Sequence, residues 1–347
     1  MISQRALNRA TLARQLLLRR HAMNPMEVIE HLVGLQAQAP VPPYFGLWSR
    51  MASFQPQELS ELLVSRQVVR ITLMRGTVHL VSARDCLAIR PLIQPMLTRA
   101  LAARRVDGVD RDAVVAAGRA LLTERPLSVK AMTPLLAERF PDAAPGDLPV
   151  ILRSLLPMVQ VPPRGVWGRA GDAVLTPVEA WLGRDLDPAP ALDQLLRRYL
   201  AAFGPATVAD MQAWSGLAGL RAAAARLDLV DLGGGVLDLP DAPRPEEDTP
   251  APVRLVAPFD NLVLGHADRT RVISDEHRKR VITINGQVHG TVLVDGYVHG
   301  IWKRDKAAVT VSPFGPLTAA QREEIEAEAV ALLAFAEPGK PPAVSFD

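Results

Sequence analysis

Two carboxamide side chains stand two residues apart in the segment Gly34-Leu35-Gln36-Ala37-Gln38-Ala39-Pro40. Alternate residues of an extended segment point the same way, so Gln36 and Gln38 are expected to converge on one ligand or water molecule while Ala37 faces inward. A neutral amide pair orients water through hydrogen bonds. Because Gln-x-Gln is a common pattern, the alternative interpretation is that these residues form a polar segment at the end of a helix without a functional role.

An aromatic pair follows this segment. Tyr44 and Trp48 are one helical turn apart, so their rings are expected on one face of a helix. Rings at this spacing stack on sugars or bases in nucleic-acid-binding proteins, and they also pack in protein cores. The sequence leaves both interpretations open.

Positive charge is concentrated in parts of the chain. Residues 66–105 contain eight arginines and one acidic residue, and residues 1–20 contain five arginines and no acidic residue. Residues 231–248 have the opposite balance, with six acidic residues and one arginine. The net charge of +2 averages over these segments, and we expect a basic surface that contacts phosphates. Arg70, Arg75 and Arg84 are the predicted DNA-binding residues, and the alternative for each is a solvated arginine on a helix face.

The histidines raise the possibility of a further site. A group in the C-terminal third has enough ligand types for a metal ion: Asp268, Glu276, His277, His289 and His299. None shows the i, i+4 spacing of a helical metal pair, so we expect turn-flanking residues and no metal. His266 and Arg269 are candidates for facing DNA. The chain has no P-loop and no dinucleotide fingerprint after a strand, so no cofactor is expected.

Several helices precede the first β-prone segment. A helix is expected over residues 3–20, and a second has a clear start, with Asn24 as N-cap, Pro25 at the first position and Glu27 closing a capping box. Shorter helices follow over residues 44–51 and from Pro56. Residues 68–74 and 77–81 then predict a hairpin with its tip at Arg75-Gly76. Helices followed by a hairpin are typical of a winged helix.

A similar order appears twice more, so the chain resembles a tandem array. We expect four domains: 1–105, a first winged helix with the Gln-Ala-Gln motif; 106–186, a second winged helix; 187–250, a third winged helix with a linker; and 251–347, a β-rich domain with a C-terminal helix. The helices of the second copy are expected over residues 110–123, 129–140 and 147–156, and those of the third over 191–203, 207–214 and 217–226. The predicted fold class is α+β.

The motifs together resemble the AlkZ/YcaQ-type winged-helix DNA glycosylases. The resemblance is carried by Gly-Leu-Gln-Ala-Gln-Ala-Pro, by Pro-Pro-Tyr-Phe-Gly-Leu-Trp-Ser-Arg at residues 42–50, by residues 72–81, and by Pro-Phe-Asp-Asn-Leu-Val-Leu-Gly-His-Ala-Asp-Arg at residues 258–269. It implies three tandem winged helices and a barrel-like β element in a C-shaped molecule. In that family a Gln-Φ-Gln or Gln-Φ-Asp motif, with Φ hydrophobic, positions the hydrolytic water, and Gln36 and Gln38 match its amide version.

The resemblance implies a monofunctional hydrolase that removes cationic N7- or N3-alkylated purines, including bulky adducts or interstrand crosslinks, from double-stranded DNA. A positively charged purine departs without protonation, so holding water near the anomeric carbon suffices. No Schiff base is expected, because the first of five lysines is Lys130. Two alternatives remain: a non-catalytic winged-helix regulator or lesion binder, and a small-molecule or protein-interaction module without DNA affinity.

Composition sets the remaining expectations. A chain of 347 residues with 48% hydrophobic and 22% charged residues is globular and long enough for two or three domains. One cysteine excludes an internal disulfide or a Cys-rich zinc module and favours a reducing compartment. Arginines near the start leave no signal-peptide core, and no apolar run reaches the about 20 residues of a membrane span. We therefore expect a cytoplasmic, nucleoid-associated monomer.

Overall fold

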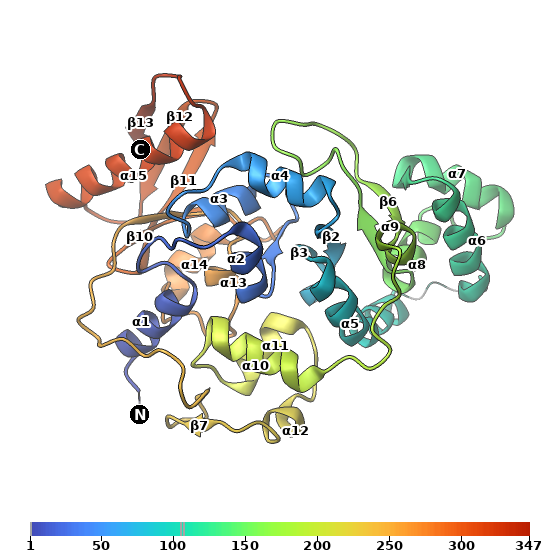
Figure 1. The fold of residues 1–347 in the computed structure, drawn as a ribbon, viewed down its shortest axis with the longest axis horizontal. Helices are drawn as coiled ribbons and strands as arrows, with labels where there is room; N and C mark the ends of the chain where they lie inside the picture. Colours follow the sequence, from blue (N-terminus) through green and yellow to red (C-terminus); the bar gives the residue numbers. More distant parts are fainter. Residues whose placement is uncertain (1, 105, 107) are drawn as a thin grey trace. The chain divides into compact units, whose positions relative to one another are not determined.

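The computed structural model describes residues 2–104, 106 and 108–347 (Figure 1). The chain divides into two compact units. Unit 1 contains residues 1–55, 196–214 and 219–347, and unit 2 contains residues 56–195 and 215–218. Arg105, the last arginine of the basic stretch, lies outside the described residues. The predicted first winged helix, residues 1–105, is thus divided between the units, and the four-domain division stays a prediction.

Unit 1 begins with three helices. They are α1 (Gln4–Arg14), α2 (Pro25–His31) and α3 (Pro42–Trp48), with the short strand β1 (Leu35–Gln36) between the last two. The predicted capping box is confirmed, because Asn24 accepts a hydrogen bond from the Glu27 backbone and the Glu27 side chain accepts one from the Asn24 backbone. The predicted helix over residues 3–20 ends early, because the chain turns at Leu16, which has φ of +59°.

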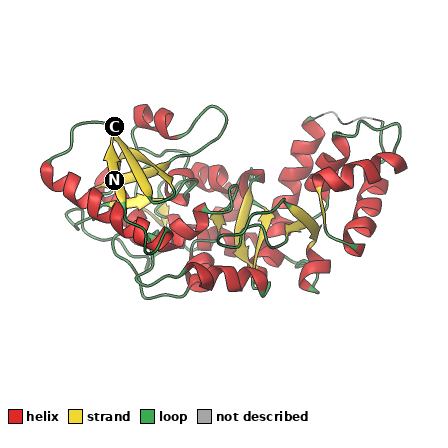
Figure 2. Cartoon of the chain, turned by 90° about the horizontal axis from the view of Figure 1, so that it is seen from above, coloured by secondary structure: helices red, strands yellow, loops and turns green. Residues whose placement is uncertain are grey.

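The rest of unit 1 combines helices with an open sheet (Figure 2). Its further helices are α10 (Leu192–Phe203) from residue 196 onward, α11 (Val208–Ser215) up to residue 214, α12 (Arg221–Ala224), α13 (Asn261–Leu264), α14 (Asp275–Val281) and α15 (Ala319–Ala336). Its strands are β7 (Val230–Asp231), β8 (Leu237–Asp238), β9 (Arg254–Val256), β10 (Gly290–Val294), β11 (Tyr297–Asp305), β12 (Ala308–Pro313) and β13 (Ala343–Phe346).

The larger sheet of unit 1 has the order β13-β12-β11-β10-β9, and β7 and β8 form a separate two-stranded antiparallel sheet. The pairs of the larger sheet are antiparallel except β12 with β13. Gly290 pairs with Trp302, and a Cβ at Gly290 would lie 2.6 Å from the indole ring, so only glycine fits there. The sheet is open, with β13 and β9 at its edges, so the barrel-like expectation is not confirmed.

Unit 2 contains one further sheet with helices around it. The strands β3, β2, β5, β6 and β4 lie side by side in that order. Their bounds are β2 (Val68–Thr72), β3 (Val78–Ser82), β4 (Leu127–Ser128), β5 (Met158–Gln160) and β6 (Val174–Pro177). The helices are α4 (Pro56–Val64), α5 (Ala83–Ala103), α6 (Arg111–Glu124), α7 (Val129–Arg139), α8 (Asp147–Leu155) and α9 (Val178–Leu182), with a 3₁₀ turn at Met74–Gly76.

The hairpin of β2 and β3 is as predicted, with Val68 opposite Ser82 and Thr72 opposite Val78. The three helices expected within residues 110–156 are confirmed as α6, α7 and α8. Helix α5 was not predicted. It carries the single cysteine, Cys86, which is buried, and burial raises the pKa of its thiol to about 12. No helix among the described residues is long and apolar enough to cross a lipid bilayer.

Candidate active site

The Gln36–Gln38 segment follows a sharp turn in unit 1. After α2 the chain passes through two residues with positive φ, Val33 at +56° and Gly34 at +94°, before entering β1. A β-branched residue in the left-handed region is a steric outlier, and such strain persists only where the surroundings hold it. Gln36 is 8% exposed and Ala37 is fully buried, whereas Gln38 is exposed.

A side chain from a distant part of the sequence holds this turn. Nδ2 of Asn261 donates a hydrogen bond of 2.8 Å to the carbonyl oxygen of Gly34, and Asn261 is buried. Asn261 is the first residue of α13, so this helix fixes the backbone two residues before Gln36. Two of the motif segments are therefore in direct contact inside unit 1.

A buried ion pair joins a third motif segment to the same helix. The guanidinium of Arg50 binds both carboxylate oxygens of Asp260 at 2.8 Å, and both side chains are essentially unexposed. Arg50 also donates to the carbonyl oxygens of Gly46 and Gln15, at 2.9 and 2.8 Å. Asp260 in turn caps α13 by accepting from the Leu262 backbone. This bidentate geometry fixes direction as well as distance.

These contacts were not predicted from the sequence. The resemblance marked residues 42–50 and 258–269 as family segments, but spacing along the chain says nothing about which residues meet. The sequence feature that could have indicated the ion pair is a pair of oppositely charged residues, Arg50 and Asp260, each of which lies in a largely apolar segment. Buried charges in proteins are paired, so such residues are candidates for one another.

Tyr44 and Trp48 lie in the core of unit 1. Tyr44 is 1% exposed and its ring lies beside that of Phe54, while Trp48 packs against Phe335 and beneath the guanidinium of Arg20. Rings buried in this way are not available to stack on a nucleotide. The packing interpretation of these two residues is therefore the one that fits the structure.

His266 is also a packing residue. It is fully buried beside the Tyr199 and Phe203 rings, and its Nε2 donates to the carbonyl oxygen of Phe203 at 2.9 Å. Burial and the charge of Arg271 hold the pKa of His266 well below its usual range, so the ring is neutral. Arg269, half-buried, donates to the His266 carbonyl oxygen. The structure does not place the His266 side chain at a surface where DNA binds.

The predicted DNA-binding arginines of unit 2 differ in exposure. Arg70 is 1% exposed and packs closely against Gly165, where an added Cβ would lie 2.9 Å from its Cδ. A guanidinium buried in this way does not contact DNA, so the prediction for Arg70 does not fit. Arg84 has 67% of its side chain exposed, at the start of α5.

Arg75 lies at the hairpin tip with φ of +56° and lines a hollow of about 300 Å³. Two other arginines reach the same hollow: Arg104 follows α5 and Arg153 lies on α8. Thr72 and Ser154 add hydroxyl groups, and the described lining contains no acidic residue. Arg153 was missed because it lies outside the basic stretch, on a helix assigned to another repeat.

The described residues bring no three His, Cys, Asp or Glu side chains together at metal-binding distance. His277 packs on Phe314, with ring centroids 4.6 Å apart, and does not join His289 and His299 in a ligand cluster. The candidate active site is therefore the carboxamide segment of unit 1 with the residues that support it. The arginine hollow of unit 2 is a candidate for DNA binding within that unit.

Comparison with known proteins agrees with the resemblance of the motifs. The family model described as DNA glycosylase AlkZ-like matches residues 29–335. A curated protein of Streptomyces sahachiroi, the interstrand DNA cross-link repair glycosylase, is 25% identical over 91% of this chain and 92% of its own length. The solved structure of Streptomyces sahachiroi DNA glycosylase AlkZ matches with a TM-score of 0.81 at 21% identity, over 100% of both chains.

Proposed function

Because the chain belongs to the AlkZ-like DNA glycosylase family, we propose that it hydrolyses the N-glycosidic bond of cationic N7- or N3-alkylated purines in duplex DNA, using Gln36 and Gln38. The observation that carries this proposal is the strained Val33-Gly34 turn, which Asn261 holds directly before the carboxamide segment. Strain that the surroundings maintain is frequent at functional sites.

The chemistry needs few groups. The water oxygen forms a bond to C1′ while the bond from C1′ to the purine nitrogen breaks. The electron pair of the broken bond remains on the purine nitrogen and neutralises the cationic base. The extra proton of the attacking water passes to solvent. The amide oxygens of Gln36 and Gln38 accept hydrogen bonds from this water and fix its position, which lowers the entropic cost of the attack. No acid is required, because alkylation has already charged the leaving group.

The arginines of unit 2 give this protein a means to hold DNA. Arg84, Arg104 and Arg153 are exposed, and Arg75 is half-buried and shares its hollow with Arg104 and Arg153. Guanidinium groups bind phosphate oxygens bidentately, and each contact releases counterions from DNA. Because the Streptomyces sahachiroi relative is an interstrand DNA cross-link repair glycosylase, the proposed substrates include bulky adducts and interstrand crosslinks.

The test is release of free 7-methylguanine from methylated duplex DNA. We expect the intact protein to release the base, and Gln36→Ala and Gln38→Ala each to lower the single-turnover rate by about 10- to 1,000-fold, the range for loss of a positioning group. The matched control is Gln287→Ala, because Gln287 is an exposed glutamine in a turn of the same unit. Its rate should equal that of the intact protein.

The same assay separates the alternatives. A protein that binds duplex DNA but releases no base from any alkylated substrate is a non-catalytic binder. Borohydride added during turnover should trap no covalent complex, since the proposed hydrolysis is monofunctional and uses no lysine. A trapped complex would assign a Schiff base and overturn that part of the mechanism.

A further inference from the structure

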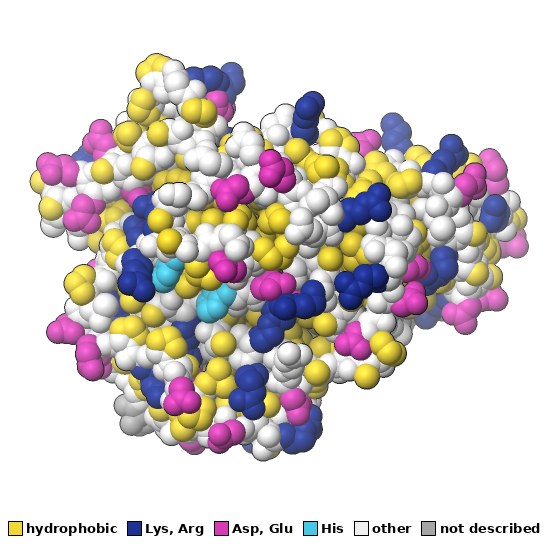
Figure 3. Space-filling view, viewed as in Figure 1, with side chains coloured by type: hydrophobic (Ala, Val, Ile, Leu, Met, Phe, Trp, Pro, Cys, Tyr) yellow, Lys and Arg dark blue, Asp and Glu magenta, His cyan; other side chains and the backbone are white. Residues whose placement is uncertain are grey.

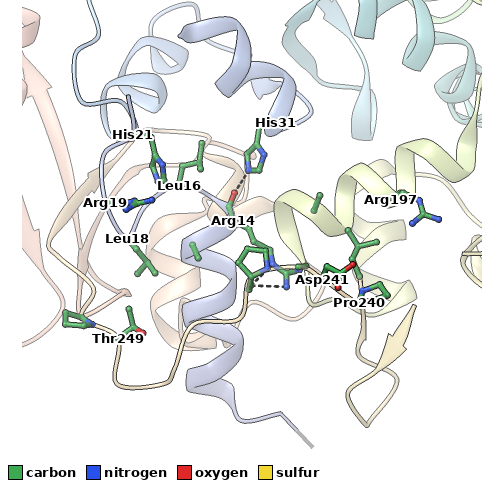
Figure 4. A pocket seen from close by; sticks show the side chains of 16 residues that line it. Arg14, Leu16, Leu18, Arg19, His21, His31, Arg197, Pro240, Asp241 and Thr249 are labelled. Atoms are coloured by element: carbon green, nitrogen blue, oxygen red, sulfur yellow. Dashed lines mark hydrogen bonds between the residues drawn. The ribbon is translucent and has the colours of Figure 1, made fainter. Parts of the chain in front are cut away.

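Unit 1 contains a hollow that is larger than the arginine hollow of unit 2. It has a volume of about 890 Å³, within the roughly 300–1,000 Å³ of small-molecule sites. Its walls come from α1 and the turn after it, from the end of α2, from α10, and from residues 239–250 (Figure 4). Leu16, Leu18, Ala201 and Pro240 give it an apolar interior.

The floor of this cavity is fixed by Arg14. Its guanidinium binds Asp238 through two hydrogen bonds of 2.6 and 2.9 Å, and neither side chain is exposed. It also donates to the carbonyl oxygens of Leu200 and Pro243. All its donors are used, so Arg14 stabilises the wall and presents no charge to a ligand.

The proline-rich wall is held in the same way. Arg244 donates to Asp238 at 2.5 Å and to the carbonyl oxygens of Leu239 and Pro240, and Arg9 donates to that of Thr249. Residues 239–250 overlap the stretch 240–252 that the sequence predicts as a linker, and these hydrogen bonds hold them in one position.

The rim carries cationic groups. Arg19 and Arg197 are exposed, and neither has an ion pair within the described part of the chain. His21 and His31 lie on the same rim, as Figure 4 shows. His31 donates from Nε2 to the Arg14 carbonyl oxygen at 2.6 Å, which leaves Nδ1 as its second polar atom.

The balance of charge around the cavity is positive. Asp241 is the one exposed acidic residue in the described lining. Burial, followed by the charge of Arg19, lowers the pKa of His21, so a neighbouring cation already opposes protonation there. Figure 3 shows histidine side chains on this face with both basic and acidic side chains beside them. An anion at the rim would relieve this repulsion.

We propose that this cavity is a binding site for a small organic anion with an apolar body, such as an aromatic carboxylate or sulfonate. The apolar part would fill the space between Leu16, Leu18 and Ala201, and the anionic group would lie between Arg19 and Arg197. Duplex DNA is a poor occupant, because phosphates remain hydrated and gain nothing from an apolar interior. Neither Gln36 nor Gln38 is among the described residues that line this cavity.

Two naphthalene probes that differ in charge test the proposal. The anionic probe is 1-anilinonaphthalene-8-sulfonate, and the neutral one is N-phenyl-1-naphthylamine, which lacks the sulfonate. We expect the anionic probe to bind with one-to-one stoichiometry by calorimetry. Arg19→Gln and Arg197→Gln should each weaken its binding about threefold to fivefold and leave the neutral probe within about twofold. Arg221→Gln removes an exposed arginine outside the cavity and should change neither affinity.

A cavity-filling variant gives the second measurement. Ala201→Trp places an indole in the space and should abolish binding of both probes, while circular dichroism and thermal unfolding report whether the variant is folded. If a folded Ala201→Trp protein still binds the anionic probe, the cavity is not the site. Competitive displacement of the probe by unmodified duplex DNA would also overturn the proposal, because the hollow would then belong to the DNA surface.

Discussion

At the scale of single residues, the candidate site depends on two buried contacts. Arg50 with Asp260 and Asn261 with Gly34 join segments more than 200 residues apart in sequence. Removing one member of a buried ion pair leaves the other charge without its partner, which costs more than the pair contributes. These contacts hold the backbone of the turn that precedes Gln36. Their loss should therefore affect both the stability of the protein and the release of the base.

We expect Arg50→Met to lower the free energy of unfolding by about 3–5 kcal/mol, because the Asp260 carboxylate is left buried and unpaired. Asp260→Asn keeps a capping side chain for α13 and removes the charge. The double variant should therefore be more stable than the sum of the single losses by at least about 1 kcal/mol. Urea unfolding of all four proteins measures this coupling, and strictly additive losses would contradict it.

Asn261→Ala should leave the Gly34 carbonyl oxygen without its donor, at a cost of about 1–3 kcal/mol. Release of 7-methylguanine should fall as well, because the turn before Gln36 is no longer held. Thermal unfolding and single-turnover kinetics at a temperature where the variant is folded separate the two effects. An unchanged rate would show that Asn261 serves stability alone.

His79 makes stability depend on pH. It is buried in β3, and burial, with the nearby charge of Arg75, lowers its pKa from 6.5 to about 3. Between these values the unfolded chain binds the proton and the folded one does not, so stability falls as the pH drops below about 6.5. The free energy of unfolding should therefore decrease between pH 7 and pH 5, and His79→Asn should make this decrease smaller by about 2 kcal/mol. His299→Asn, which leaves His79 in place, should keep the full loss in denaturant titrations at both pH values.

At the scale of elements, α5 shows why part of the fold escaped prediction. Pro91 and Pro95 lie inside this helix, and a proline normally ends one. Pro91 has no N–H for the carbonyl oxygen of Leu87, and the Asp187 backbone donates to that oxygen instead, at 3.0 Å. A distant backbone group thus replaces the missing helical bond, and no local pattern reports that.

The hairpin tip is positioned by a close approach of backbone to backbone. A Cβ on Gly216 would lie 3.1 Å from the backbone nitrogen of Arg75 and would collide with the sulfur of Met96. Gly216 also has φ of +78°. We expect Gly216→Ala to displace the tip and weaken DNA binding. Gly219→Ala has similar strain, with φ of +73°, but open space around it, so it should lose about 1 kcal/mol of stability and keep its DNA affinity.

At the scale of the whole molecule, the sequence predicted local structure better than assembly. The capping box of α2, the hairpin of β2 and β3, and helices α6 to α8 follow from cap residues, glycines and hydrophobic spacing. The open edges of the β-rich sheet and the burial of Arg70, Tyr44 and Trp48 depend on contacts between distant segments. The sequence does not show whether a given arginine or aromatic ring lies on the surface or in the core.

DNA affinity should depend on salt through the arginine hollow of unit 2. If Arg104 and Arg153 contact phosphates, each change to Gln should lower the slope of log affinity against log salt by about 0.9. Arg184→Gln, an exposed arginine of the same unit outside the hollow, should leave the slope unchanged. Fluorescence anisotropy over a series of salt concentrations measures all three, and equal slopes would remove this hollow from the DNA surface.

The single thiol of the chain has a practical consequence. Cys86 is buried and its pKa is raised, so thiol-directed dyes should react with it slowly in the folded protein. An exposed cysteine introduced into each unit would therefore accept a dye selectively, with the native residue left in place. Energy transfer between two such dyes would follow how the separation of the units changes when damaged DNA is added.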